Sequence, residues 1–586
     1  MNYNLNQLNE EQEKQSTYQA LKRLLKFISA ERKNLILALV AILINSGLLL
    51  LGPLLVGHTI DTYIRTKQFH GVLVFGGILL CMYLIAMVTG YIQTKLMGGV
   101  GQRMLYTLRN AIFNKLQELP VSFFNQNKAG DLISRVNSDT DKLNQFFSQS
   151  LMQFIGSIVT MIGAGIFLLS INIELGAAAL SPAVAIVIFT IALSPWIKSK
   201  NAKNLKSVGG LSAEVQESLN NFKVIIAFNR RDYFRKRFDE ANKENYRTAI
   251  GAGLANNIFV PVYGLLSSIA QLIVLLFGIH LISIGQFSLG FLVSYLSYCT
   301  NFYNPLRQLA ALWTSFQVAM ASWDRISKIL LLETNLQVIK NDETITSDAL
   351  IEFKDVHFSY DDSKEILHHI NLKFEKGKTY ALIGPTGGGK TTTASLISRL
   401  YDATKGTVLL NGKDIRSFSA EERTQKIGFI LQEPFLFTGT VKDNILYGNN
   451  QYKDVSDDEL TKIIEQANLG ALLAIFDEGI STKITSGSDS ISLGQKQLIA
   501  FMRAVLRNPE LLILDEATAN IDTITEQLLS SILNKLSKET TLVIIAHRLN
   551  TIENADEIYF VNEGEVQQAG TLNDALKMLS KGKRVS

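Results

Sequence analysis

Cysteine is nearly absent from this chain of 586 residues, which holds two, Cys81 and Cys299, both inside apolar stretches. We therefore expect no disulfide framework, and we interpret both thiols as buried. Because no cysteine precedes Cys81, we also expect no N-terminal cysteine protease domain. Signal-peptide character is missing as well, since residues 1–30 are polar and charged and hold no signal-type apolar core.

Charged residues are scarce too. They make up 19% of the chain, against about 25% in ordinary soluble domains. The net charge of +4 is too small to indicate a nucleic-acid partner. Apolar residues reach 47%, and the chain is too long for one ordinary domain. This combination predicts a membrane protein that also has a soluble part.

What the first half does contain is a series of long apolar stretches. A run of about 20 apolar residues crosses the hydrocarbon core of a membrane as a helix. These runs lack the alternation of barrel strands, so we expect helices. The last is the least apolar, because Asn301, Asn304 and Arg307 interrupt it. The six predicted spans cover residues 35–60, 72–92, 151–171, 175–197, 258–284 and 291–318.

Basic residues are distributed unevenly over the loops between these spans. The long loops after the second and fourth spans are rich in Lys and Arg, whereas residues 171–174 and 285–290 hold none. Cytoplasmic loops carry the excess of basic residues. We therefore expect both long loops and both termini in the cytoplasm, and the spans in the plasma membrane. The many Asn, Lys and Ile residues indicate a bacterial source.

The long loops show helical periodicity. Leucine and isoleucine recur at helical spacing over residues 105–119. We expect the spans to continue into the cytoplasm as helical arms, joined by short crosspieces at 120–127 and 220–227. Residues 18–32 mix basic and apolar side chains, which predicts an amphipathic helix on the inner membrane surface. A plain extension of the first span is the alternative.

The second half has the composition of a soluble α/β domain and opens with a phosphate-binding motif. Residues 384–391 fit G-x4-G-K-[ST], between a predicted strand at 379–383 and a predicted helix. Backbone N–H groups of such a loop wrap phosphates, and the helix N-terminus adds its dipole. We expect Lys390 to reach the β- and γ-phosphates of ATP and Thr391 to ligate Mg²⁺. The other nucleotide-binding residues predicted here are Gly384, Thr386, Gly387, Gly388, Gly389 and Thr392.

A second apolar strand, 511–514, ends in two carboxylates, Asp515 and Glu516. We expect Asp515 to hold Mg²⁺ through water and Glu516 to polarise the attacking water as a general base. A strand that ends in Asp-Glu is a weak signal by itself. Together with the phosphate loop it predicts an ATP hydrolase.

Further motifs follow in a fixed order around Tyr360, Gln432 and His547. They are Phe-Ser-Tyr, Ile-Leu-Gln-Glu-Pro and Ile-Ala-His-Arg-Leu. With them, residues 350–586 resemble an ABC-type ATPase cassette. The chain as a whole resembles a half-transporter of the multidrug, lipid and peptide exporter type, although residues 1–15 add nothing to the likeness.

This resemblance implies roles for the motif residues. Tyr360 would stack on adenine, Gln432 would sense Mg²⁺ and face the membrane domain, and His547 would contact the γ-phosphate. Asp522, in Ala-Asn-Ile-Asp, would touch the second cassette of a dimer. Lys390, Glu516 and His547 are then the catalytic residues, and Thr391, Gln432 and Asp515 the metal ligands.

One motif departs from the family pattern. The signature Leu-Ser-Gly-Gly-Gln is here Ile-Ser-Leu-Gly-Gln. In the family this segment caps the ATP of the other cassette, and Leu493 adds a branched side chain where the backbone should approach closely. Residues 485–488 also lack the acidic residue usual in exporters. The predicted trans-acting residues are Ser492, Leu493, Gly494, Gln495 and Asp522.

The intact phosphate loop and the altered signature lie on one chain. A homodimer would have two damaged sites, whereas a heterodimer could have one good site and one poor site. We therefore expect a partner half-transporter with an intact signature. A homodimer that tolerates Leu493 is the alternative.

Polar residues of the sixth span are candidate substrate contacts. An ionisable residue inside a membrane is a functional hypothesis by default, and in the family this helix lines the central cavity. Arg307 and Asn304 would then face a substrate. Alternatively, the helix continues into the cytoplasm and Arg307 lies near the inner interface.

The predicted fold class is multidomain: an all-α polytopic membrane domain with six transmembrane helices and long cytoplasmic extensions, followed by an α/β P-loop ABC ATPase domain. The expected bounds are 1–33 for the N-terminal segment, 34–325 for the membrane domain, 326–349 for a linker and 350–586 for the nucleotide-binding domain. We predict ATP- and Mg²⁺-dependent export of a small amphipathic or hydrophobic substrate, of the drug or lipid class, by alternating access. An importer of similar fold and an ATP-gated regulator or channel are the alternatives.

Overall fold

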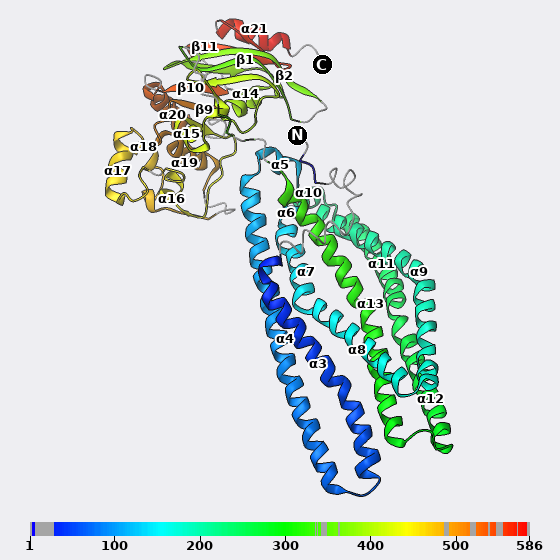
Figure 1. Ribbon diagram of the computed structural model, residues 1–586. Coiled ribbons are helices and arrows are strands. Elements are labelled where there is room, and N and C mark those ends of the chain that lie inside the picture. Colours follow the sequence, from blue (N-terminus) through cyan, green and yellow to red (C-terminus); the bar gives the residue numbers. More distant parts are fainter. Residues whose placement is uncertain are drawn as a thin grey trace. The chain divides into compact units, whose positions relative to one another are not determined.

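The chain forms two compact units in this computed structural model (Figure 1). Unit 1 comprises Met1–Glu11, Gln117–Ala129 and Leu332–Ser586, and unit 2 comprises Gln12–Leu116 and Gly130–Leu331. The predicted amphipathic helix at 18–32 lies outside the described residues except for its end, the 3-10 turn η1 (Ile28–Glu31), and Arg32. The structure describes residues 3–5, 28–333, 336, 338–340, 348–360, 364–449, 451–485, 491–515, 523–536, 540–545, 555–570 and 572–582.

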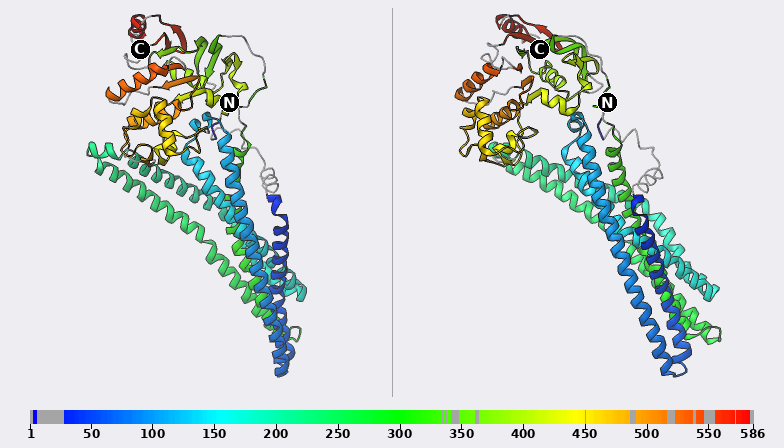
Figure 2. Two further views of the ribbon diagram at one scale, coloured as in Figure 1. Left: turned by 90° about the vertical axis from the view of Figure 1, so that its left-hand side faces the viewer. Right: turned by 60° about the vertical axis from the view of Figure 1, so that its left-hand side comes forward.

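Every regular element in the described part of unit 2 is a helix. Its long helices are α3 (Arg32–Thr59), α4 (Phe69–Glu118), α8 (Leu151–Ile171), α9 (Ile173–Asn220), α11 (Arg231–Asn257), α12 (Phe259–Ser283) and α13 (Leu289–Leu331). Shorter helical segments are η2 (Ile60–Ile64), α6 (Ala129–Ser134), η3 (Arg135–Asp139), α7 (Thr140–Gln145) and η4 (Phe146–Ser150). Helices α9 and α11 lie side by side (Figure 2).

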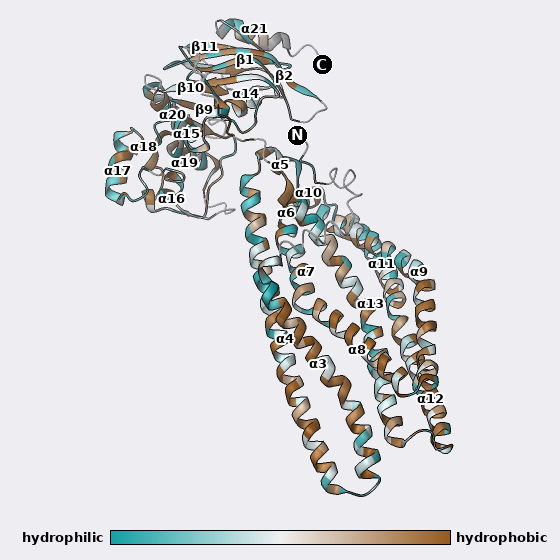
Figure 3. Cartoon of the chain, viewed as in Figure 1, coloured by the Kyte–Doolittle hydropathy of each residue, from teal (hydrophilic) through white to brown (hydrophobic). Residues whose placement is uncertain are grey.

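Hydrophobic residues dominate α3 and α8 (Figure 3). Among the described residues, five helical stretches are long and apolar enough to cross a membrane, and they cover the first five predicted spans except for Ile284 at the end of the fifth. They are Arg32–Ile64, Phe69–Glu118, Ala129–Ile171, Ile173–Asn220 and Arg231–Ser283. The chain is therefore a membrane protein with an N-terminal helical membrane domain.

Helix α13 holds the sixth predicted span and is not among those five stretches, because serine, threonine, asparagine and tyrosine residues dilute its apolar side chains. Its buried hydroxyl groups donate hydrogen bonds to backbone carbonyl oxygens of other helices. Tyr298 Oη lies 2.7 Å from the carbonyl oxygen of Leu50, and Tyr303 Oη lies 2.8 Å from that of Ala179. Polar groups inside a membrane must be satisfied within the protein. These contacts explain how a helix of lower hydropathy fits the bundle.

Both predicted crosspieces are present as short helices. Helix α5 (Val121–Gln126) follows α4, and α10 (Phe222–Ala227) joins α9 to α11. Pro120, with an extended backbone, separates α4 from α5. Proline has no backbone N–H to donate, so it cannot continue the hydrogen bonding of α4. The 50 residues of α4 extend about 75 Å at 1.5 Å per residue.

The C-terminal part of unit 1 has two main sheets. The first is antiparallel, in the order β2-β1-β4-β5. The second has the order β12-β11-β3-β10-β9-β6 and is parallel except for β12. Strands β3, β9 and β10 are buried throughout, as expected for parallel strands covered on both faces. The strands are β1 (Ala349–Ser359), β2 (Glu365–Glu375), β3 (Thr379–Ile383), β4 (Lys405–Leu410), β5 (Lys413–Asp414), β6 (Ile427–Ile430), β7 (Gly439–Thr440), β8 (Lys483–Ile484), β9 (Leu511–Asp515), β10 (Thr541–Ile545), β11 (Glu557–Asn562) and β12 (Glu565–Gln568).

Helices of unit 1 accompany these sheets. The core around the parallel sheet is apolar and includes Leu498, Phe501, Leu512 and Leu529. The helices are α14 (Lys390–Ile397), α15 (Ala420–Lys426), α16 (Val441–Ile445), α17 (Asp457–Gln466), α18 (Gly470–Leu473), α19 (Leu493–Val505), α20 (Thr523–Leu536) and α21 (Leu572–Gly582).

The N-terminus of the chain packs on the first crosspiece, within unit 1. Tyr3 and Leu5 are buried. The Tyr3 ring meets Phe123 of α5 edge-on, with ring centroids 6.4 Å apart. Tyr3 N donates to Gln126 Oε1 at 2.7 Å, and Asn127 Nδ2 donates to Tyr3 O at 2.9 Å. Sequence reasoning assigned no role to these residues.

Candidate functional site

The predicted site residues follow the carboxyl ends of adjacent parallel strands. Ile545 of β10 pairs with Leu382 of β3 on one side and with Asp515 of β9 on the other. Ile430 at the end of β6 pairs with Leu514 of β9. The four strands therefore end at one level. In sheets of this kind ligands bind outside these carboxyl ends.

The loop between β3 and α14 is built on glycine. Gly384, Gly387 and Gly389 have positive φ angles of 145°, 82° and 115°, a backbone region that L side chains rarely adopt. A Cβ at Gly384 would lie 1.9 Å from the carbonyl oxygen of Val561, and one at Gly388 would lie 2.6 Å from the same atom. The sequence pattern therefore meets both a conformational and a steric requirement.

Two opposite charges are buried at this edge. Lys390 opens α14 and is 5% exposed, with Nζ 2.8 Å from the carbonyl oxygen of Gly384 and 3.0 Å from that of Pro385. Asp515 ends β9 and is 4% exposed. A buried ammonium group at a helix N-terminus fits phosphate oxygens. A buried carboxylate fits Mg²⁺, which prefers oxygen ligands. The residues present therefore fit a magnesium-bound nucleotide.

Tyr360 and Thr392 are linked. Tyr360 lies directly after β1, and its Oη is 3.0 Å from Thr392 Oγ1 on α14. The Tyr360 ring packs edge-on against Phe358 and Tyr401, with ring centroids 4.8 Å and 5.1 Å away. This cluster holds the Tyr360 ring beside the phosphate loop, with 41% of the residue exposed. Thr391 is exposed next to the buried Thr392.

Sequence reasoning missed Tyr401 and its partner on the first crosspiece. Asn125 Nδ2 of α5 donates to Tyr401 Oη at 2.6 Å. Burial raises the pKa of the Tyr401 phenol, so the hydroxyl group stays protonated. Since Tyr401 contacts Tyr360, α5 and the candidate adenine contact share one neighbour. No motif in the sequence marks this pair.

Four other predicted residues stand differently. Gln432 is exposed just after β6. Glu516, Asp522 and His547 lie outside the described residues. The nearest described neighbours of Glu516 and His547 are Asp515 and Ile545, which end strands at the edge that holds the phosphate loop. Asp522 directly precedes α20 in the sequence.

The altered signature forms the start of α19. Ser492 caps the helix: Gln495 N donates to Ser492 Oγ at 3.1 Å, and Ser492 N donates to Gln495 Oε1 at 2.9 Å. Leu493 is the first helical residue and is 40% exposed, and Gly494 follows it. Because its backbone is helical, Leu493 causes no conformational strain. It presents an apolar side chain next to Ser492 in the sequence.

The candidate substrate contacts lie on α13 in unit 2. Arg307 and Asn304 are both exposed, and Pro305 lies between them inside the helix. The structure places them one helical turn apart, on the segment of α13 that follows the buried Tyr303.

Two family models match the chain in succession. The ABC transporter transmembrane region matches residues 35–306, and the ABC transporter model matches residues 367–519. The chain is 32% identical over 568 residues to the uncharacterized ABC transporter ATP-binding protein YfiC of Bacillus subtilis, covering 95% of this chain and 92% of that protein. The chain belongs to the ABC transporters. This ABC transporter is an exporter-type half-transporter that couples ATP hydrolysis to transport.

Two relatives of this ABC transporter carry more specific names. The chain is 30% identical to the ATP-dependent lipid A-core flippase of Vibrio parahaemolyticus over 96% of each protein. It is 32% identical to a fatty acid ABC transporter ATP-binding/permease protein of Mycobacterium bovis, over 84% of this chain and 77% of that protein. A half-transporter implies dimerisation, and the ATPase region implies ATP binding.

Proposed function

We propose that this half-transporter exports a small amphipathic or hydrophobic compound of the drug or lipid class, as one subunit of a heterodimer. The observation that carries the proposal is the contrast on one chain between a complete phosphate loop and the Leu493 side chain at the start of α19. The export of lipids fits the flippase and fatty acid transporter names of two relatives.

The proposed hydrolytic site uses this chain's own strand ends. Lys390 holds the β- and γ-phosphates from within the glycine loop, and Tyr360 offers its exposed ring to adenine. Thr391, Gln432 and Asp515 would hold Mg²⁺, which supplies charge neutralisation on the phosphates when bound.

The remaining catalytic roles fall on residues that follow described strands. Glu516, directly after Asp515, would orient and polarise the attacking water. His547, two residues past Ile545, would contact the γ-phosphate. Thr386 and the loop glycines would offer backbone N–H groups to the phosphates.

Leu493 makes the signature of this chain a poor cap for a partner's ATP. The Ser492 oxygen accepts from Gln495 N, and its hydrogen stays available to donate. The serine chemistry is therefore intact. The exposed leucine side chain, however, occupies space beside that hydroxyl where the family has glycine. A partner with an intact signature would complete the site formed by Lys390 and Glu516, while Asp522 would contact that partner.

The crosspieces are the proposed route from hydrolysis to the membrane helices. Asn125 of α5 already contacts Tyr401, next to Tyr360. On α10, Phe222 and Val224 are more than half exposed, and so is Phe228 just after it. An exposed apolar cluster of this kind marks an interaction surface. We propose that the partner's cassette binds this surface of α10. We also propose that the transporter lies in the plasma membrane, with both termini in the cytoplasm.

ATPase activity of the chain purified alone in lipid nanodiscs tests the heterodimer. We expect low activity alone, and activity at least tenfold higher after co-expression with the right second half-transporter. Glu516→Gln should abolish the gain, because it removes the general base of the better site. Leu493→Gly in the lone chain should raise activity, because it restores the family signature.

The proposal fails if the lone chain hydrolyses ATP at full rate in a way that depends on both Glu516 and Ser492. Uptake of a fluorescent amphipathic compound into sealed inside-out vesicles tests export separately. Uptake that requires ATP and Glu516 supports export, and ATP-driven loss from preloaded vesicles would show import.

A further inference from the structure

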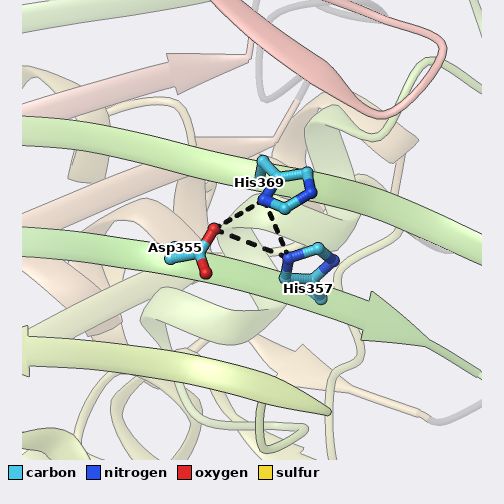
Figure 4. A group of neighbouring side chains, drawn as sticks. All are labelled: Asp355, His357 and His369. Carbon is cyan, nitrogen blue, oxygen red and sulfur yellow. Dashed lines mark hydrogen bonds and ion pairs between the residues drawn. The ribbon is translucent and has the colours of Figure 1, made fainter.

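Three side chains on β1 and β2 converge on one point (Figure 4). Asp355 and His357 belong to β1, and His369 belongs to β2. His369 Nδ1 lies 2.7 Å from Asp355 Oδ1 and 3.2 Å from His357 Nε2. His357 Nε2 lies 3.5 Å from Asp355 Oδ1. Ligand atoms at 2.0–2.1 Å from a tetrahedral metal are about 3.3 Å apart, and the three separations lie on both sides of that value.

The backbone is bent to bring these side chains together. Asp355 and His369 have positive φ angles of 47° and 49°. Register shifts interrupt the β1–β2 ladder between Phe353 and Val356 and between Val356 and Phe358. Each bulge removes hydrogen bonds from the ladder. A non-glycine residue in the left-handed region adds backbone strain. Both left-handed positions hold a side chain that can bind a metal.

A fourth side chain fixes the tautomer of His357. His357 Nδ1 lies 2.7 Å from Glu365 Oε1, so Nδ1–H donates to that carboxylate and the lone pair on Nε2 faces Asp355 and His369. A carboxylate behind a histidine is the usual outer partner of a metal ligand.

We propose that Asp355, His357 and His369 bind Zn²⁺, with Glu365 supporting His357 from behind. Two imidazole nitrogens and one carboxylate suit a first-row transition metal and not Mg²⁺ or Ca²⁺, which prefer oxygen ligands. The side chains of Asp355 and His369 are 67% and 76% exposed, so an ion can enter from solvent and keep a water ligand.

The site would tie two bulged strands together on the stretch of chain that leads to Tyr360, the adenine contact of the proposed function. His357 lies three residues before Tyr360 on the same stretch of chain. Thr404 N donates to the carbonyl oxygen of His357 at 2.8 Å, and Ser359 N donates to Thr404 Oγ1 at 3.1 Å. Zn²⁺ bound to the folded chain stabilises it by mass action. The site uses none of the residues assigned to ATP hydrolysis.

Cobalt binding to the full-length chain tests the site. The protein is purified without a histidine tag, stripped of metal by a chelator, placed in nanodiscs and titrated with Co²⁺ without nucleotide. We expect the visible absorption bands of four-coordinate Co²⁺ to saturate at one ion per chain and to disappear when Zn²⁺ is added. Zn²⁺ should also raise the midpoint of thermal unfolding.

Matched variants locate the ion. His369→Ala, at an exposed position, should remove the cobalt bands, and Glu365→Gln should weaken binding about 10- to 100-fold. His368→Ala should keep the cobalt bands. It removes the adjacent histidine, which contacts the other carboxylate oxygen of Glu365, Oε2. Absence of the bands in the unaltered chain, or equal binding by the His369→Ala and unaltered chains, would overturn the proposal.

Discussion

At the scale of single residues, the phosphate loop shows why a motif works as a predictor. The positive φ angles of Gly384, Gly387 and Gly389 disfavour other residue types, and at Gly384 the carbonyl oxygen of Val561 also leaves no room for a Cβ. Glycine is therefore strongly favoured at these positions. This requirement explains why the loop and the adjoining Lys390 can be recognised in the sequence.

Two alanine substitutions in this loop should differ in effect. Gly384→Ala combines a left-handed backbone with a Cβ 1.9 Å from the carbonyl oxygen of Val561, whereas a Cβ at Gly387 meets nothing within 4 Å. Gly387→Ala should be destabilised only by the conformational energy of a left-handed alanine, about 1–2 kcal/mol. We expect at least a tenfold loss of fluorescent ATP-analogue affinity for Gly384→Ala and a smaller loss for Gly387→Ala. Equal affinities would contradict the steric argument.

Leu493 was singled out in the sequence because it adds a branched side chain where the family backbone approaches a phosphate closely. The structure adds that its backbone has an ordinary place at the start of α19, with Ser492 capping the helix. We therefore expect the departure to act through the side chain. Tyr401 and Asn125 were missed because a contact between residues 276 positions apart leaves no local pattern.

At the scale of elements, apolar periodicity predicted the long helices, and proline and asparagine marked where the crosspieces begin. Helix α13 was the hardest to judge, because its tyrosines and serines look unsuited to a membrane until their carbonyl partners on other helices are known. Docking of Tyr3 on α5 could not be predicted either. The few residues around Tyr3 in the sequence show no apolar periodicity and match no motif.

Tyr3 is expected to stabilise the first crosspiece. Tyr3→Ala removes the buried ring beside Phe123 and should lower stability by about 3–5 kcal/mol, as for other buried aromatics. Tyr3→Phe keeps the ring and loses the 3.1 Å hydrogen bond from Oη to the carbonyl oxygen of Glu333, at a cost of about 0.5–1.5 kcal/mol. The midpoint of thermal unfolding in nanodiscs should fall more for Tyr3→Ala than for Tyr3→Phe. An unchanged midpoint in Tyr3→Ala would show that the tail contributes nothing.

In unit 2, a network of charged residues joins α6 and η3 to α13. Arg135 is 2% exposed, with Nε 2.9 Å from Asp131 Oδ2 and Nη1 2.9 Å from the carbonyl oxygen of Arg325. Arg325 in turn pairs with Asp131 and with the buried Asp139. No sequence pattern links Arg325 to Asp131, Arg135 and Asp139, because Arg325 lies 190 positions after Arg135 in the chain.

Arg135→Met should destabilise this network. Breaking a buried pair costs at most about 3–5 kcal/mol, and less here because Asp131 is partly exposed and keeps Arg325. The same change at Arg109, whose pair with Asp141 is exposed, should cost less than about 1 kcal/mol. Thermal unfolding of the two variants side by side gives the comparison. Equal shifts would mean that burial of Arg135 adds no stability.

At the scale of the whole molecule, the charge of the loops predicts the orientation. In a chain with Cys81 and Cys299 replaced by serine, Gln68→Cys should react with a membrane-impermeant maleimide added to intact cells. Lys223→Cys, on α10, should react only after the membrane is opened, since we place the crosspieces inside. Labelling of Lys223→Cys in intact cells would invert the topology and the positive-inside argument with it.

Helix α4 has a mechanical consequence. It runs for 50 residues without an internal proline, so a hinge would have to bend a regular hydrogen-bonded helix. A rigid rod of about 75 Å that tilts by about 5° moves one end by roughly 6 Å relative to the other. Such a displacement exceeds the width of a water molecule. A small rotation at the crosspiece end would therefore be enough to open or shut an aqueous path at the far end, with no change of secondary structure along the way.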